Sequence, residues 1–497
     1  MATKEKERLL PPASSTYAIQ PGDSGRIVTR NIRDTRLTTV TYSAVIVLMG
    51  SLLFGYAIGY SSPVISDLED SKTNTTPTGY LHKKQYQGIF SALMPLGALI
   101  GAPLAGWLVD YVGRKNALLY CSVPFAAGWL ITVLSHIPDE ATPVRVLLFA
   151  GRFIVGIGVG STSLCVPLYI TEISPTSLRG LYGAANQLCV TIGLFMAEMI
   201  GTYIDYYWLA MIPLGITCIF AIFTVSLKET PRWLITHGRL LEAGRVILWL
   251  RGSKYDVTNE QKDIEDQVNS ERKLTFSETL REFKTKPVYH PLILTLFLMF
   301  FQQFCGINAI IFNAEDTFEG VAKGIDPGLL SSLSVGLTQV LATFVGVILT
   351  DVLGRRILLI SGAIIMCVSI SVAGAYEYLH HENHNIPAMG IAGIVCYNIG
   401  FSIGWGALPW LLTSEIIPLR VRGAGVAIAT FVNWSLVAVV TGGYKYYQEA
   451  VNPWYAFWSF GLVCLCAAIF TAIFIPETKN KSLEDIEKSF EASLHRL

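Results

Sequence analysis

Long apolar runs separated by short polar segments dominate this chain. Residues 44–60, 88–109, 212–227 and 457–475 are clear cases, because they contain no Asp, Glu, Lys or Arg. A helix needs about 20 such residues to cross the roughly 30 Å hydrocarbon core of a bilayer. The pattern predicts twelve membrane-spanning helices, at 40–60, 86–109, 116–135, 144–168, 183–203, 208–227, 290–313, 329–350, 357–378, 386–411, 424–443 and 454–475.

The composition agrees with a membrane protein. Hydrophobic residues make up 52% of the 497 and charged residues only 15%, whereas a soluble domain carries about 25% charged residues. The mean hydropathy is +0.47. We therefore expect an all-α membrane protein. Gly and Pro interrupt the seventh and tenth spans, which a membrane helix tolerates where its backbone faces a cavity.

The polar segments divide the chain into five parts. We expect a disordered cytoplasmic tail without a cleavable signal peptide, two halves of six helices, a linker with short mixed-charge helices and a second tail. In residue numbers these are 1–39, 40–227, 228–289, 290–475 and 476–497.

Basic residues show which side of the membrane each loop occupies. Lys and Arg are concentrated before the first span, at 114–115, at 355–356 and at 420–422, while the alternate loops are short and poor in Arg. The positive-inside rule therefore places both termini and the linker in the cytoplasm. On the other side, the sequon that begins at Asn74 predicts glycosylation.

The nine cysteines all lie in predicted spans. A disulfide framework or a metal site would need thiols clustered in loops. We therefore expect these cysteines to be small apolar fillers, and we expect neither a metal nor a cofactor.

Three short charged patterns occur twice, about 240–250 residues apart, which predicts two halves of the same orientation. Parallel halves with the substrate held between them at mid-depth are a known transporter plan. Segment 110–115 recurs as 351–356, 172–180 as 415–423, and 229–232, more loosely, as 477–479.

The repeated charges fall at the predicted cytoplasmic ends of the helices. One hypothesis is a latch, in which carboxylates and guanidinium groups of neighbouring helices pair when the inner gate is shut and separate when it opens. Since one exposed ion pair is worth about 0–1 kcal/mol, a network is needed. The alternative is positive-inside topology with helix capping. We favour the latch for Asp110, Arg114, Glu172, Arg179, Glu229, Arg232, Asp351, Arg355, Arg356, Glu415, Arg422 and Glu477.

These motifs, in order and spacing, resemble the sugar porter family of the major facilitator superfamily over positions 38–482. Further matching segments are 151–152, 302–308, 404–410, 433–434 and 476–479. Within the family, 59–63 and 404–410 are most similar to animal facilitative hexose transporters with an N-terminal dileucine signal and to insect trehalose carriers. The resemblance implies passage of a small neutral sugar by alternating access through a lipid bilayer.

A sugar carrier needs amides, which both donate and accept hydrogen bonds, and flat aromatic rings for the C–H faces of the sugar. An unpaired charge would be costly. The apolar spans supply Gln187, Gln302, Gln303, Asn308, Gln339, Trp410, Asn433 and Trp434. By resemblance these match the sugar-binding positions of the family, and Phe54 and Phe401 match aromatic residues that line its cavity. For a single amide the alternative is an interhelical hydrogen bond worth about 0.6 kcal/mol, and a tryptophan also packs structurally.

Proton-coupled relatives carry an Asp after a Gly-Tyr pair in the first helix, facing an Arg in the fourth. Here Ala57 takes that place, while Arg152 is present. Passive transport is therefore favoured over proton coupling. Glu198 keeps the alternative open, because a carboxylate inside a membrane is a functional suspect. It either pairs with Arg152, or is an interfacial side chain that reaches water.

The N-terminal tail contains an acidic dileucine pattern made by Glu5, Leu9 and Leu10. It predicts a clathrin adaptor as a partner and residence in endosomes or lysosomes as well as the plasma membrane. A hexose such as glucose is the first candidate cargo, and trehalose is the alternative. A non-transporting sugar sensor is a hypothesis of another class, although such sensors usually carry longer tails. No catalytic triad, phosphate loop or nucleic-acid motif is recognised, so an enzyme is not expected.

Overall fold

The computed structural model describes residues 37–69, 80–81, 83–138, 140–175, 178–252, 255–270, 276–318, 325–382 and 386–479. Within these residues, twelve helical segments are long and apolar enough to cross a membrane. The predicted all-α architecture of twelve spans is confirmed. The dileucine residues Glu5, Leu9 and Leu10 and the sequon residue Asn74 lie outside the described residues.

The first half contains the first six spans. Its elements are α2 (Leu37–Gly59), α3 (Ser61–Glu69), α4 (Lys84–Tyr111), α5 (Arg114–Leu134), α6 (Ala141–Ile173), α7 (Arg179–Gly201) and α8 (Tyr206–Ser226). The helices α2 and α3 together form the first span, which runs to Glu69. The fourth span likewise continues to Ile173. Both extend beyond their predicted ends because a helix can continue into the polar surroundings, whereas the hydrophobic pattern reports only its apolar part.

The second half repeats this plan with more interruptions. Its elements are α13 (Lys286–Phe304), α14 (Ile307–Phe312), α15 (Ala314–Phe318), α16 (Pro327–Ser331), η2 (Ser332–Leu337), α17 (Thr338–Leu353), α18 (Arg355–His381), α19 (Pro387–Gly400), η3 (Phe401–Trp405), α20 (Leu408–Ile416), η4 (Leu419–Val421), α21 (Arg422–Ala450) and α22 (Pro453–Phe474). The predicted breaks in the seventh and tenth spans are confirmed: α13 and α14 are separated at Cys305–Gly306, and η3 is a π-helical segment. A second π-helical segment, η2 in the eighth span, was not predicted.

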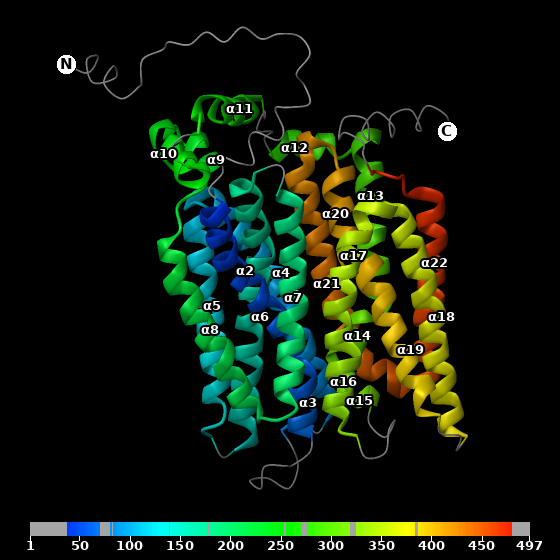
Figure 1. Ribbon diagram of the computed structural model, residues 1–497. Helices are drawn as coiled ribbons and strands as arrows, with labels where there is room; N and C mark the ends of the chain where they lie inside the picture. The colour runs from blue at the N-terminus through cyan, green and yellow to red at the C-terminus, as the bar shows by residue number, and fades with distance from the viewer. Residues whose placement is uncertain are drawn as a thin grey trace, which may run out of the picture.

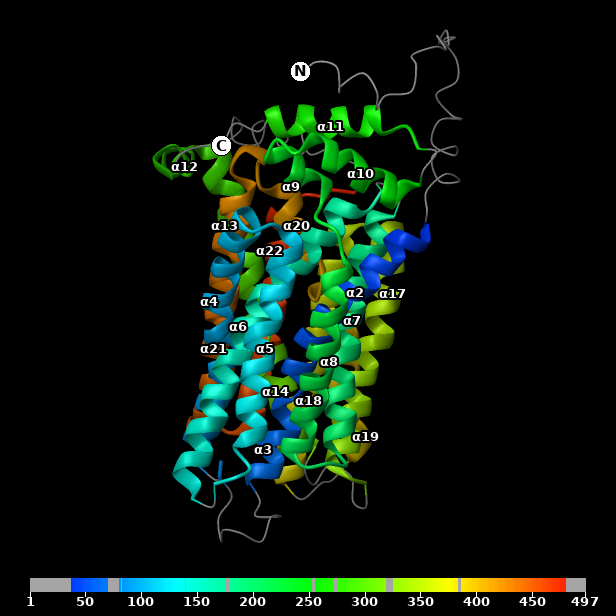
Figure 2. The ribbon, with the colours of Figure 1, turned by 90° about the vertical axis from the view of Figure 1, so that its left-hand side faces the viewer.

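The linker helices α9 (Pro231–Thr236), α10 (Leu240–Arg251), α11 (Val257–Ser270) and α12 (Phe276–Glu282) lie across one end of the two halves (Figures 1 and 2). We call this the linker end and the opposite end the far end. Arg251 bonds Glu260 within the linker at 2.8 Å and the carbonyl of Ile173 on α6 at 3.0 Å. Glu282 pairs with Arg420 of the second half at 3.2 Å. The linker is thereby attached to both halves.

The two halves contact one another towards the far end. Thr441 of α21 donates to the carbonyl of Ser91 on α4 at 3.4 Å. Ser332 of η2 donates to the Sδ of Met199 on α7 at 3.4 Å. The N–H of α15 residue Glu315 donates to the Ser62 hydroxyl at 3.0 Å. We call the boundary between the halves the seam.

Small residues bring the helices close together inside each half, as is common in membranes, where lipid gives no hydrophobic drive for helix association. Gly55 of α2 lies against the backbone of Val190 on α7, and Gly97 of α4 lies against the backbone of Phe153 on α6. A side chain at either glycine would overlap that backbone. The spacing of these helix pairs therefore depends on glycine.

We expect Gly55→Ala to destabilise the protein by about 1–3 kcal/mol, because the added methyl group has to push α2 away from α7. The readout is the apparent unfolding temperature of detergent-solubilised protein. Gly215→Ala on α8 is the control, since nothing lies within 4 Å of a Cβ there. Equal stability of the two variants would contradict this packing.

Candidate functional site

A chain of amide side chains connects the broken seventh span to the eleventh. Asn308 of α14 donates to the Oε1 of Gln303 at 2.5 Å, and Gln303 donates to Gln302 at 3.4 Å. Asn433 of α21 donates to the Oε1 of Gln302 at 2.9 Å. Four of the predicted binding residues, Gln302, Gln303, Asn308 and Asn433, are thus brought together.

The local backbone explains why Gln302 is fixed in this position. Its Nε2 donates to the carbonyls of Trp405 at 2.8 Å and Gly406 at 3.1 Å. These carbonyls lie where the tenth span changes from the π-helical η3 towards α20. Carbonyls freed at such a helix interruption need partners inside a membrane. Gln302 therefore connects the seventh, tenth and eleventh spans.

Two aromatic rings meet beside these amides across the seam. Phe54 of α2 and Trp434 of α21 have ring centroids 5.8 Å apart. Trp434 is buried, and its Nε1–H has no hydrogen-bond partner among the residues that the structure describes. A buried indole N–H usually finds a partner. This group is therefore a donor available to a ligand.

The other predicted binding residues are not joined to this chain of amides by the hydrogen bonds of the described residues. Gln339 of α17 donates to the Oδ1 of Asn398 on α19 at 3.1 Å, which is an interhelical bond within the second half. Gln187, Trp410 and Phe401 are partly buried, and the structure gives none of them a polar contact to the amide chain.

Asn398 and Trp405 are not among the predicted binding residues. Asn398 is fully buried and bonded to Gln339, and the Nε1 of Trp405 donates to the carbonyl of Leu359 at 2.9 Å. An amide within the apolar run 386–411 was a usable signal for Asn398. For Trp405 the sequence gave no signal that distinguished it from Trp410, because both lie in the same matching segment.

Arg152 and Glu198 do not pair in this structure, so the ion pair hypothesised between them is not formed. Arg152 of α6 donates to the carbonyl of Ala57 at 2.6 Å and to the Ser61 hydroxyl, and its guanidinium lies over the Phe312 ring. Glu198 is only 1% exposed, so the expectation of an interfacial side chain in contact with water is wrong.

A charged network holds the linker end of the first half together. The guanidinium of Arg114 at the start of α5 binds Glu172 of α6 at 3.0 Å. Thr230 donates to the same carboxylate at 2.5 Å. Glu229 accepts the backbone N–H of Arg114 at 2.8 Å and that of Lys115 at 3.1 Å.

The second half repeats this network residue by residue. Arg355 at the start of α18 pairs with Glu415 of α20 at 3.4 Å, and Thr478 donates to Glu415 at 2.6 Å. Glu477 accepts the backbone N–H groups of Arg355 at 3.1 Å and Arg356 at 3.0 Å. The predicted repeat of these motifs is therefore a repeat of contacts.

A glycine precedes the arginine in both networks. Gly113 and Gly354 have φ values of 94° and 93°, in the left-handed region that favours glycine. A Cβ on Gly354 would also lie 2.7 Å from Glu477 Oε2, and one on Gly113 would overlap Glu229. Glycine thus allows the glutamate to reach the first N–H groups of the helix.

The remaining predicted gate residues are less connected. Asp110 lies 3.5 Å from Arg114 but is largely exposed. Arg179 is exposed, and Arg422 donates to the carbonyl of Ile417 at 3.3 Å. Arg232 is partly buried in α9, and Asp351 belongs to α17, although its side chain is outside the described part. The ion pairs named above join helices of the same half.

No group of His, Cys, Asp and Glu among the described residues could hold a metal ion. All nine cysteines are free thiols. The predicted interpretation of these cysteines as fillers of apolar helices agrees with their positions.

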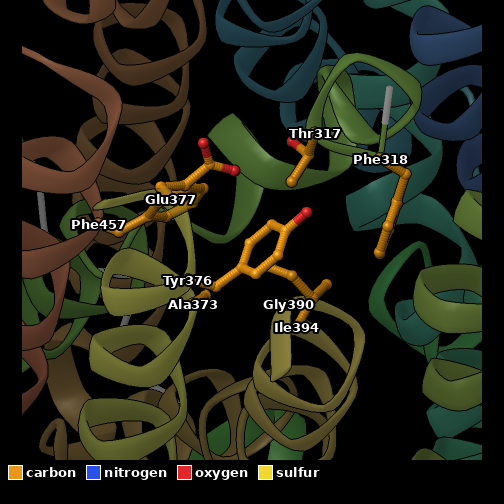
Figure 3. A pocket seen from close by; sticks show the side chains of 8 residues that line it. All are labelled: Thr317, Phe318, Ala373, Tyr376, Glu377, Gly390, Ile394 and Phe457. Atoms are coloured by element: carbon orange, nitrogen blue, oxygen red, sulfur yellow. The ribbon is translucent and has the colours of Figure 1, made fainter. Parts of the chain in front are cut away.

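A small cavity among the described residues lies away from the amide chain. Figure 3 shows Glu377, Thr317 and Tyr376 around it, between α15, α18 and α19 of the second half. Its volume of about 10 Å³ is roughly what a single water molecule needs. It is too small for a sugar.

Comparison with known proteins gives a family match over nearly the whole chain. The model of a family described as "Sugar (and other) transporter" matches residues 43–490. The facilitated trehalose transporter Tret1 of Apis mellifera ligustica is 35% identical over 97% of this chain and 95% of its own length. The protein of the same name from Drosophila virilis is 34% identical over 92% of this chain, which spans 49% of that longer relative.

Solved structures support the fold. The proton:xylose symporter XylE, bound to 6-bromo-6-deoxy-D-glucose, superposes with a TM-score of 0.75 at 24% identity, covering 91% of this chain and 99% of the XylE chain. An inward-open structure of the E. coli protein gives a TM-score of 0.76 at 22% identity, covering 90% and 99%. At this level of identity the likeness shows the shared architecture.

The two networks differ in how well they tolerate a charge. Burial raises the pKa of Glu229, and its backbone N–H donors do not offset this. Burial also raises the pKa of Glu477, but the N–H groups of Lys479, Arg355, Arg356 and Thr478 outweigh burial, and the net pKa is lowered. Compared with water, the surroundings therefore ease ionisation of Glu477 and hinder ionisation of Glu229.

We expect Glu477→Gln to lower the apparent unfolding temperature at pH 7 more than Glu229→Gln does, because only the first removes a favoured charge. The direction of the Glu477 pKa shift also determines how the stability of the protein responds to acid. The contribution of Glu477 is present above its ordinary pKa and is lost as pH falls through its lowered value. Acidification should therefore reduce the difference in apparent unfolding temperature between wild type and Glu477→Gln. Thermal unfolding at a series of pH values from 7 downwards measures this difference. A larger loss in Glu229→Gln at pH 7 would contradict this account.

Proposed function

Because this chain belongs to the sugar transporter family of the major facilitator superfamily, we propose that it carries an uncharged sugar across its membrane by alternating access. It is a multi-pass membrane protein of a transporter family, not of an enzyme family. The observation that carries the proposal is the meeting of uncharged amides of the second half beside the Phe54–Trp434 contact across the seam, where the Trp434 Nε1–H has no partner among the described residues.

The chemistry of this cluster suits a polyhydroxylated neutral ligand. Gln303 and Asn308 each have a polar atom that can exchange its internal hydrogen bond for one to a hydroxyl group. Phe54 and Trp434 present flat apolar faces for the C–H surfaces of a sugar. The side chain of Gln302 already forms hydrogen bonds with Trp405, Gly406 and Asn433. We therefore assign Gln302 to positioning the cluster as much as to binding the sugar.

The contacts between the halves support an alternating-access cycle. The bonds from Thr441, Ser332 and Glu315 close the seam towards the far end. Each charged network, by contrast, ties helices of one half together at the linker end. We propose that the networks keep each half rigid as the linker end opens and closes, in place of a latch across the seam.

Passive transport is supported by the surroundings of Arg152. Ala57, whose carbonyl accepts from Arg152, cannot carry a proton. The described contacts of Arg152 are to a carbonyl, a hydroxyl and aromatic rings, not to a carboxylate. A proton pathway through this arginine would need a titratable partner.

A hexose such as glucose and the disaccharide trehalose are the two candidate cargoes. The names of the insect relatives support trehalose together with facilitated transport. The basic residues at the linker end, among them Arg114, Lys115, Arg355 and Arg356, favour a cytoplasmic linker end with both termini on that side. Residence at the plasma membrane or in endosomes and lysosomes, adaptor binding through Leu9 and Leu10, and glycosylation at Asn74 remain predictions from sequence.

Purified protein in proteoliposomes should equilibrate radiolabelled glucose or trehalose down a gradient of the sugar. Because the carrier is passive, an imposed proton gradient should not drive accumulation above equilibrium. Protein-free vesicles and labelled L-glucose are the controls. Binding without flux for every sugar would favour the sensor and refute the carrier.

We expect Trp434→Phe to raise the KM for the transported sugar about tenfold, since it keeps an aromatic ring but removes a hydrogen bond worth about 1.4 kcal/mol. Trp129→Phe is the matched control. Trp129 is also buried with an unpartnered Nε1, but its ring packs against Tyr56 and Tyr60 inside the first half. An unchanged KM in Trp434→Phe would remove this residue from the site.

A further inference from the structure

Glu198 is a carboxylic acid buried near the far end of α7. The side chain is 1% exposed, and among the described residues no side chain donates to its carboxyl oxygens; the one group directed at them is the backbone N–H of Gly336. Buried carboxyl groups in native proteins are generally paired or well hydrogen-bonded, so a carboxyl group with so few donors calls for an explanation. The amide cluster and the charged networks do not use this residue.

The second half of the molecule covers this carboxyl group. A Cβ placed on Gly336 of η2 would lie 2.7 Å from Glu198 Oε2, so η2 meets α7 directly at this side chain. Ser332, also of η2, bonds Met199 beside it. A π-helical turn within a membrane helix often marks a functional site. Glu198 is therefore sealed by the closure of the seam.

The charged groups around this position do not neutralise an ionised Glu198. Glu315 of α15 is the charged side chain that acts on it, and its charge has the same sign. On neighbouring elements Asp67 accepts the N–H of Tyr206, Asp326 caps α16, and Lys445 pairs with Asp316. Arg152 is bonded to Ala57 and Ser61.

An ion taken out of water without a partner costs several kcal/mol, whereas a neutral carboxylic acid costs much less. Closing the far end over Glu198 therefore favours its protonated form. Parting the halves there would return the carboxyl group to water, where an ordinary glutamate ionises with a pKa of about 4.3.

We propose that Glu198 is a proton-binding site that controls closure of the far end, with the proton bound when the seam is shut and released when it opens. The proposal rests on the alternating-access cycle proposed above. Its sign follows from linkage: the closed state binds the proton more tightly, so acid favours closure and rising pH favours opening. Because η2 covers Glu198 close to the far end, the proton enters and leaves from the far end. It gates the cycle and does not travel with the sugar.

The test measures distances between spin labels in the full-length protein as the pH of the solution changes. One pair, Tyr203→Cys with Ile386→Cys, reports on the far end. A second pair, Tyr111→Cys with Val352→Cys, reports on the linker end. All four positions are exposed, and the native cysteines are replaced beforehand because three of them are exposed.

In the otherwise wild-type background we expect the far-end distances to lengthen between pH 5 and pH 8, with the open-to-closed ratio changing by about tenfold for each unit by which the pKa differs between the two states. The linker-end distances should shorten in parallel. Glu198→Gln should hold the short far-end distances at every pH. Glu315→Gln should weaken the pH dependence, since it removes the charge that opposes ionisation.

Glu377→Gln is the matched control. Glu377 is also a carboxyl group near the far end, but it lies on α18 and borders a small cavity lined by residues of the second half (Figure 3). This variant should respond to pH as wild type does. Size-exclusion chromatography before labelling establishes that each variant is folded and monodisperse.

A pH response that survives in Glu198→Gln, or is lost equally in Glu377→Gln, would overturn the proposal. Proton-driven sugar accumulation that disappears in Glu198→Gln would overturn the gating role, because the proton would then travel with the sugar. Absence of flux for every sugar would refute the proposed carrier, while the label distances, which need no sugar, would still decide the role of Glu198.

Discussion

Inside a membrane every backbone polar group needs a partner within the protein, and this constraint organises the centre of the molecule. The seventh span breaks at Cys305–Gly306, and the tenth changes to a π-helical turn. At the second of these interruptions, Gln302 satisfies the carbonyls of Trp405 and Gly406 by donating to them. It thereby offers its oxygen to Asn433. The irregular backbone and the amide cluster are thus one arrangement, because the side chains that repair the helices are also those that can bind hydroxyl groups.

At the linker end, too, one side chain both satisfies backbone N–H groups and connects helices. Glu229 and Glu477 each follow the last helix of a half, and each returns to the first N–H groups of α5 or α18. The positive end of a helix dipole favours such a carboxylate. Gly113 and Gly354 permit the approach because no Cβ stands in the way. One contact therefore fixes the end of a six-helix half to its middle, which is what a half that moves as one body requires.

The two halves differ in what they leave unsatisfied at the seam. Trp434 offers an indole donor beside Phe54, and Glu198 presents a carboxyl group beneath Gly336. A donor without a partner suits a ligand that comes and goes. A buried acid without a cationic partner suits a proton that does the same. Burial is costly for Trp434 without a ligand and for Glu198 without its proton. Binding of the ligand or of the proton is therefore connected to the contact between the halves.

The hydrophobic pattern by itself determined the twelve spans and the breaks in the seventh and tenth spans, because the bilayer imposes length and polarity on every segment independently of its neighbours. The repeated charged motifs likewise indicated where in each half related charged groups would lie, but not which of them would bond. Only the tertiary structure decided which groups meet. It showed that Gln339 bonds Asn398, that the Arg114–Glu172 and Arg355–Glu415 ion pairs each remain within one half, and that Glu198 is buried against η2 and not paired with Arg152. These outcomes depend on helix rotation and on close glycine contacts between distant segments, and a one-dimensional pattern does not contain either.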